Sequence, residues 1–76
     1  MTTLAALLVS ARGPRTVTSI AAASGLSRRT INLYERGQVP TLMSLVKLAD
    51  ALGLSLAARR EVLAAHVAAT TAAVRS

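Results

Sequence analysis

Four apolar segments of this chain each begin just after a threonine or serine and end at a glycine, and this punctuation constrains the fold more than any other feature. A threonine or serine caps a helix by accepting a hydrogen bond from a free backbone N–H group, and glycine adopts the left-handed conformation that ends helices. The segments predict helices at about 4–12, 17–24, 28–36 and 42–52. Ser55 starts a fifth, alanine-rich helix at about 56–72. Since no segment alternates with the period of a strand, we expect an all-α fold of five helices.

The apolar residues within these segments follow helical spacing, which predicts the faces that form the core. The first helix has Leu4, Leu7, Leu8 and Ala11, and the fourth has Leu42, Leu45, Val46, Leu48, Ala49 and Leu52. On the fifth helix we expect the core to use only the first part of a stripe formed by Leu56, Leu63, Val67 and Val74, with fraying somewhere past Thr70 and Thr71. The surplus predicts either packing against a partner helix or a frayed end. We favour a homodimer through Leu56, Leu63 and Val67.

Size and composition restrict the class of protein. We expect residues 1–76 to form a single domain, because a chain of 76 residues has room for one core and none for a large cleft. The absence of cysteine excludes disulfides and thiolate metal sites, and favours a cytoplasmic protein. The longest uncharged stretches are shorter than the roughly 20 apolar residues of a membrane span.

The chain is strongly basic, with nine Lys and Arg, three Asp and Glu, and a net charge of +6. Such an excess predicts a polyanionic partner. Five arginines and one glutamate lie between Arg12 and Arg36, so this segment carries +4 of the total. The concentration favours DNA over a membrane surface, which we keep only as a distant alternative.

The spacing of small and apolar residues across the second and third helices is typical of a helix-turn-helix. That motif needs a small residue where the helices approach, a turn residue that tolerates positive φ, and apolar anchors for the second helix. Ala21, Gly25 and Ile31 supply these in order. Ile20, Leu26 and Tyr34 add apolar contacts, with Tyr34 on the inner face of the third helix.

Residues 20–37 (IAAASGLSRRTINLYERG), 40–42 (PTL) and 45–55 (LVKLADALGLS) resemble the lambda-repressor/Cro-like helix-turn-helix family, also called XRE. The resemblance covers about residues 4–67 and includes the Glu35-Arg36-Gly37 element after the third helix. It implies a five-helix DNA-binding domain acting in transcription regulation, commonly as a homodimer on a two-fold operator. It also implies an ion pair between Glu35 and an arginine of the first helix, for which Arg12 is the candidate.

Within this framework, Arg28, Arg29, Asn32 and Leu33 are the candidates for reading bases. Arginine pairs with guanine through two hydrogen bonds, asparagine can read adenine or meet a phosphate, and an apolar side chain can contact the thymine methyl group. The family usually has glutamine where this chain has Val17, and Leu33 replaces a position that is often polar.

We expect the DNA phosphates to be contacted from the start of the second helix, the start of the third helix and the loop that follows it. The candidates are Thr16, Val17, Thr18, Ser27, Thr30, Arg36, Gln38 and Thr41. Ser27 and Thr41 are equally explained as helix caps.

Nothing in the sequence predicts an enzyme or a cofactor. Asp50 and Glu61 lack a paired acid or base, and His66 is the only histidine. A single histidine without suitable neighbours is a poor metal site. We therefore predict a transcriptional regulator of bacterial or phage type, most simply a repressor, that binds a palindromic duplex operator. The alternative is an antitoxin-type or adaptor protein that binds another protein through Met43 and the fifth helix.

Overall fold

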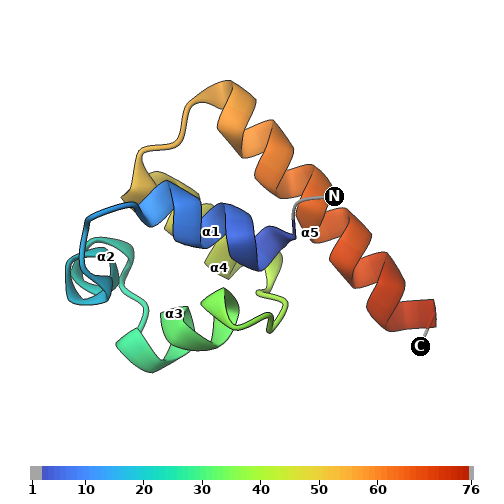
Figure 1. Cartoon of the computed structure of the whole chain (residues 1–76), viewed down its shortest axis with the longest axis horizontal. Helices are drawn as coiled ribbons and strands as arrows, with labels where there is room; N and C mark the ends of the chain where they lie inside the picture. The colour runs from blue at the N-terminus through green and yellow to red at the C-terminus, as the bar shows by residue number, and fades with distance from the viewer. Residues whose placement is uncertain (1–2, 76) are drawn as a thin grey trace.

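The computed structural model describes residues 3–75, and within this range every regular element is a helix. The five helices are α1 (Leu4–Arg12), α2 (Val17–Ser24), α3 (Arg28–Glu35), α4 (Leu42–Leu52) and α5 (Leu56–Arg75), arranged as in Figure 1. The all-α prediction is confirmed. Helix α3 ends at Glu35 with Arg36 as its cap, as predicted to within one residue, whereas α5 continues to Arg75 rather than ending near residue 72.

Helices α1 to α4 begin at the predicted N-terminal caps. The side chains of Thr3, Thr16, Ser27 and Thr41 each accept a hydrogen bond from the backbone N–H three residues later. Such a cap contributes about 1 kcal/mol because it satisfies a donor that the helix itself cannot. The capping hydroxyl groups therefore determine where these short helices begin.

The core is aliphatic apart from one tyrosine. Helix α2 packs against α3 and α4, and α1 packs against α3 and α5. Tyr34 is only 6% exposed, which confirms that it lies on the inner face of α3. The buried cluster consists of Leu4, Leu8, Ile20, Ile31, Tyr34, Leu45, Leu48, Leu52 and Val62.

The predicted core face of α5 was wrong. Val62 is buried at 4% exposure, whereas the next residue, Leu63, is 47% exposed. Consecutive residues of a helix point about 100° apart, so α5 cannot present both to the body. The side that meets the body is built from Val62 and small half-buried alanines, Ala58, Ala65 and Ala69. All four residues expected to form the stripe are exposed, namely Leu56, Leu63, Val67 and Val74.

Two residues of the predicted α4 stripe also lie outside the core. Leu42 is 54% and Val46 is 45% exposed, while Leu45, Leu48, Ala49 and Leu52 are buried as predicted. Only one side of α4 is buried in the core, and α2 packs against the helix on that side. Part of the broad apolar face of α4 is therefore exposed on the surface of the protein.

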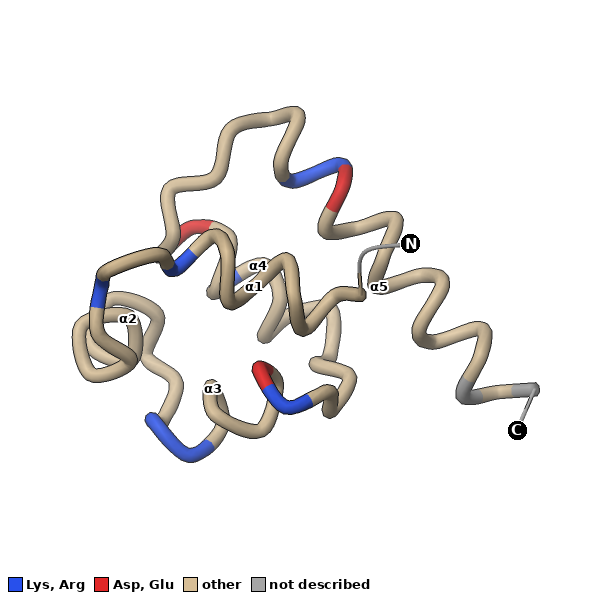
Figure 2. The backbone as a smooth tube through the Cα atoms, in the orientation of Figure 1, with Lys and Arg blue, Asp and Glu red and all other residues tan. Residues whose placement is uncertain are grey.

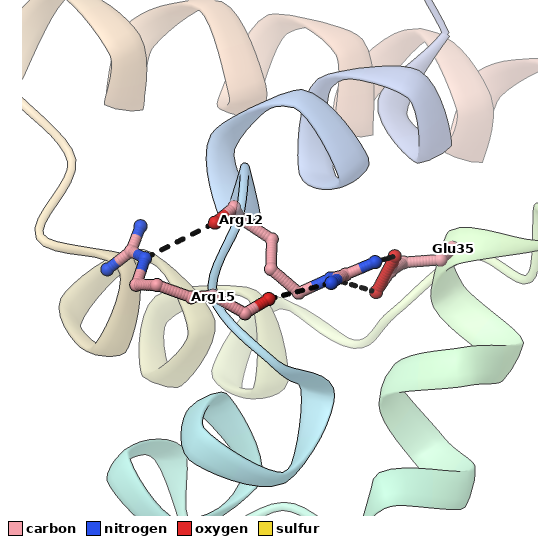
Figure 3. A network of polar contacts seen from close by, with 3 residues as sticks. All are labelled: Arg12, Arg15 and Glu35. Atoms are coloured by element: carbon pink, nitrogen blue, oxygen red, sulfur yellow. Dashed lines mark hydrogen bonds and ion pairs between the residues drawn. The ribbon is translucent and has the colours of Figure 1, made fainter.

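An ion pair joins the end of α1 to the end of α3 (Figure 3). The Arg12 guanidinium donates from Nε and Nη2 to the Glu35 carboxylate at 3.0–3.2 Å, and the side chains are 24% and 12% exposed. Its Nη1 donates to the Arg15 carbonyl at 2.7 Å. The pairing of Glu35 with Arg12 that the resemblance implied is confirmed, and it fixes the C-terminal end of α3 to the scaffold.

Arg15 has a structural role that the sequence did not predict. Its guanidinium donates to the carbonyl oxygens of Ala11 and Leu52 at 2.9 and 3.2 Å. These carbonyls lie at the C-terminal ends of α1 and α4, where a helix leaves acceptors unsatisfied and a positive charge is favourable. Arg15 thus ties two helix ends together.

Candidate nucleic-acid interface

The turn between α2 and α3 has the geometry that the motif requires. Gly25 takes the left-handed conformation, with φ +77° and ψ 5°, and its N–H donates to the Ala21 carbonyl at 3.0 Å. Ile20 and Ile31 are 2% and 3% exposed and hold the two helices to the same core. Helix α3 is consequently anchored along one side only, and its other side is free to meet a ligand.

The free side of α3 borders a hollow of about 700 Å³ between the two helices. All four predicted base-reading residues line it, together with three of the predicted phosphate contacts. Those seven residues are Arg28, Arg29, Asn32, Leu33, Val17, Thr18 and Arg36. Arg28, Arg29 and Asn32 are exposed, and Leu33 and Val17 are half-buried. The structure therefore collects residues from two helices into one surface with a polar, basic rim and a partly apolar floor.

The arginines of this region divide into two groups. Arg12 and Arg15 donate to a carboxylate and to backbone carbonyls inside the fold. Arg28, Arg29 and Arg36 are exposed, and their guanidinium groups have no acceptor or carboxylate within hydrogen-bonding distance among residues 3–75. Figure 2 shows basic positions in blue at the start of α3 and at its end, with an acidic position in red beside the latter. Because Glu35 is engaged by Arg12, the charge of the three arginines is available to a polyanion.

Three of the predicted phosphate contacts, Thr16, Ser27 and Thr41, use their hydroxyl groups as helix caps. Ser27 Oγ accepts from the Thr30 N–H and lies 2.8 Å from Thr30 Oγ1. Thr41 Oγ1 accepts from the Ser44 N–H and donates to Ser44 Oγ at 3.0 Å. Thr16 Oγ1 accepts from the Ser19 N–H at 3.0 Å. Thr16, Ser27, Thr30 and Thr41, with the exposed Gln38, lie outside the lining of the hollow.

The residues predicted for dimerisation lie on a separate surface. Leu63 and Val67 share a shallow groove of about 290 Å³ with Leu42 of α4. Leu56 is 67% exposed and lies at the start of α5, outside that groove. Met43, which the alternative hypothesis used, is also 67% exposed.

Sequence reasoning gave His66 no role, yet the structure gives it a specific partner. Its Nε2 lies 2.8 Å from the carbonyl oxygen of Pro40, in the loop between α3 and α4. A lone histidine on an alanine-rich helix carries no local signal for this contact, since the partner is distant in sequence. Arg15 was missed for the same reason.

Among residues 3–75, no three His, Asp or Glu side chains come together in a way that would bind a metal ion. None of the helices in this range combines the length and the apolar character needed to cross a membrane.

The fold and the basic hollow define a helix-turn-helix protein. The model of the Helix-turn-helix family matches residues 11–58, which is more than half of the chain. The chain therefore belongs to the helix-turn-helix family of the lambda-repressor type, whose function is DNA-binding regulation. No curated protein and no solved structure matches it significantly.

Proposed function

We propose that this protein is a sequence-specific repressor that inserts α3 into the major groove of a duplex operator. The observation that carries the proposal is the group of three exposed arginines without intramolecular acceptors, placed around one hollow. Arg28 and Arg29 lie at the N-terminus of α3, where the helix dipole opposes positive charge. A bound polyanion would offset that cost, so the arrangement is favourable only with a ligand in place.

The chemistry of the hollow suits base edges. Arg28 and Arg29 would donate to guanine, and Asn32, one turn further along the exposed side, would bind adenine or a phosphate. Leu33 cannot form hydrogen bonds to a base through its side chain, but it can contact a thymine methyl group. Val17 borders the same hollow and extends this apolar surface.

The DNA backbone would be held from several directions. Thr16, Val17 and Thr18 would offer the free N–H groups of the α2 N-terminus to one phosphate, in place of the glutamine side chain that the family usually has there. Ser27 and Thr30 at the start of α3 would meet a second phosphate through their hydroxyl pair. Arg36, Gln38 and Thr41 would bind phosphates beside the groove.

We further propose that residues 1–76 act as one domain and that two copies bind a palindromic operator as a homodimer. Leu56, Leu63 and Val67 supply exposed apolar surface on α5, and Leu42 extends it onto α4. Exposed apolar patches of this kind mark interaction sites. A dimer would place two α3 helices in successive major grooves and would multiply the specificity of a single small domain.

Repression is the simplest outcome, because blocking polymerase requires only occupancy of the DNA. We propose a cytoplasmic, nucleoid-associated protein without catalytic activity. Three of its four Asp, Glu and His side chains have partners in the fold: Asp50 pairs with Arg59 at 2.7 Å, Glu35 with Arg12, and His66 with the Pro40 carbonyl. The fourth, Glu61, is exposed on α5.

The alternative is an antitoxin-type or adaptor protein that uses the apolar surface of α4 and α5 for another protein. Sedimentation of the wild type and of the Leu63→Ser, Val67→Ser variant separates the two hypotheses. We expect a dimer that the double substitution converts to a monomer. A wild-type chain that is monomeric in solution and on DNA would favour the alternative.

The central experiment selects bound fragments from random duplex DNA and then measures affinity for the selected sequence. Arg28→Ala and Arg29→Ala should each weaken binding by roughly 5- to 150-fold for each half-site, the range expected when one arginine–guanine pair is lost there. Arg60→Ala is the matched control, since Arg60 is exposed on α5, away from the hollow. If both α3 variants bind as tightly as the wild type, α3 is not the recognition helix.

A further inference from the structure

His66 connects α5 to the loop that follows the recognition helix. Its ring Nε2 lies 2.8 Å from the Pro40 carbonyl oxygen in a partly buried contact. A carbonyl oxygen only accepts hydrogen bonds, so the histidine nitrogen is the donor. The contact spans 26 residues of sequence and is a hydrogen bond between the second half of α5 and the segment 36–41.

The hydrogen bond from His66 lies between two parts of the loop that other hydrogen bonds hold. Its first part is held by backbone hydrogen bonds from Gly37 and Gln38 to the carbonyls of Tyr34 and Leu33, at 3.1 and 3.0 Å. Its last residue, Thr41, caps α4. Between them lies Pro40, which has no N–H to donate, so its carbonyl is the one backbone group through which it can be anchored by a hydrogen bond.

The orientation of the Pro40 carbonyl determines what the loop presents to solvent. Carbonyl and following N–H belong to one planar peptide unit, so holding the Pro40 oxygen also fixes the direction of the Thr41 N–H. That N–H opens the N-terminus of α4, where unsatisfied donors favour an anion. The side chain of Gln38 is exposed on the same loop.

We propose that His66 is a positioning residue for the DNA-backbone contact: from α5 it fixes the Pro40–Thr41 peptide so that the loop and the start of α4 meet a phosphate. This inference rests on the proposed function. His66 itself does not touch DNA, and it acts through the loop it holds. Its removal should therefore cost one phosphate contact and leave base recognition by α3 unchanged.

The test compares His66→Phe, which keeps a ring but removes the donor, with His66→Gln, whose amide nitrogen can donate from the equivalent position. Ala68→Ser is the matched control, because Ala68 is exposed on α5 near His66 in the sequence and lies outside the groove proposed for dimerisation. The probe is a mixed-sequence duplex of about 20 base pairs, which is long enough for two half-sites. We would measure the affinity of each variant for this duplex as a function of salt concentration. The temperature is one at which circular dichroism shows all variants folded.

The slope of log affinity against log salt should be smaller by about 1.8 for a His66→Phe dimer, which is the loss of one phosphate contact, worth about 0.9, in each protomer. This amounts to about 60-fold weaker binding near 0.1 M salt and to no difference when the data are extrapolated to 1 M. His66→Gln should restore most of the slope, and Ala68→Ser should leave it unchanged. In the free protein, the backbone order parameter of Thr41 should be near 0.85 for the wild type and fall toward about 0.6 in His66→Phe.

The outcomes separate this inference from the proposed function. A wild-type protein that shows no salt-dependent binding to duplex DNA would refute the proposed function. If the wild type binds with a steep slope that Arg28→Ala weakens, but His66→Phe has an unchanged slope and a rigid Thr41, the positioning role of His66 is wrong. An affinity loss in His66→Phe that is equal at all salt concentrations would also overturn it, because that loss would not come from a phosphate contact.

Discussion

The ion pair between Arg12 and Glu35 should be the single polar contact that contributes most to the stability of this fold. Replacing Arg12 by methionine keeps the aliphatic part of the side chain and removes the guanidinium. The Glu35 carboxylate, which is only 12% exposed, then loses three contacts of 3.0–3.2 Å and stays in its half-buried place. The connection from the end of α1 to the end of α3 is lost with them.

The cost follows from the exposure of the pair. Breaking a fully buried ion pair costs about 3–5 kcal/mol, and breaking an exposed pair about 0.2–1 kcal/mol. With side chains 24% and 12% exposed, this pair lies between these limits, so we expect Arg12→Met to lower the free energy of unfolding by about 2 kcal/mol. For a domain of this size that loss corresponds to a fall in melting temperature of roughly 8–16 °C.

The assay is urea unfolding followed by circular dichroism for the wild type, Arg12→Met, Glu35→Gln and the double variant. The double-mutant cycle should give a coupling energy of about 1 kcal/mol or more, because the two side chains are in direct contact. The pair between Arg59 and Asp50 is the internal control. It is formed at 2.7 Å but its side chains are 39% and 65% exposed, so Asp50→Asn should cost less than about 1 kcal/mol.

The reasoning would be refuted by an Arg12→Met variant that loses no more stability than Asp50→Asn, or by a coupling energy near zero. Either result would mean that water solvates the Glu35 carboxylate in solution. High salt provides a second check, since a half-buried pair is screened less than an exposed one. The coupling energy of Arg12 and Glu35 should therefore persist in about 0.5 M salt.

Three further stability predictions use the same unfolding assay. Gly25→Ala should cost about 1 kcal/mol through backbone strain alone, because φ is +77° and the added Cβ meets nothing within 4 Å; an unchanged midpoint would contradict the left-handed conformation. Thr16→Ala should cost about 1 kcal/mol by removing the cap of α2, whereas Thr16→Ser should be nearly neutral, and equal losses for both would exclude the capping role. Ile31→Val should cost about 0.5–1.5 kcal/mol and Ile31→Ala about 2–5 kcal/mol, since the side chain is 3% exposed; a loss below 1 kcal/mol for alanine would place Ile31 outside the core.

The parts of the fold that could be predicted are those decided by residues close in sequence. Thr3, Thr16, Ser27 and Thr41 were predicted as caps because a cap needs only its own hydroxyl and an N–H three residues later. The helix-turn-helix followed from Ala21, Gly25 and Ile31 on the same grounds. These features are local, so a single sequence specifies them.

The core face of α5 depends on geometry that the sequence does not contain. Its alanines contribute little apolar area, so Val62 and Leu63 compete for the core with nearly equal local preference. The approach of α1 decides between them, and it places Val62 inside and Leu63 outside. The His66 contact with Pro40 and the Arg15 contacts with helix ends are equally nonlocal, since each partner is brought near only by the complete fold.

The five arginines between Arg12 and Arg36 have different roles in the structure, which their charge alone does not reveal. The segment from Arg12 to Arg36 carries a net charge of +4, and the sequence assigns all of it to a polyanion. In the structure, Arg12 and Arg15 serve the scaffold, because Glu35 and the C-terminal carbonyls of two helices lie within their reach. Arg28, Arg29 and Arg36 have no such acceptors among residues 3–75 and surround the hollow. We therefore expect DNA affinity to depend on the side chains whose hydrogen-bonding capacity the fold leaves unused. A salt dependence greater than these three arginines can explain would require backbone N–H contacts such as those proposed at α2 and α4.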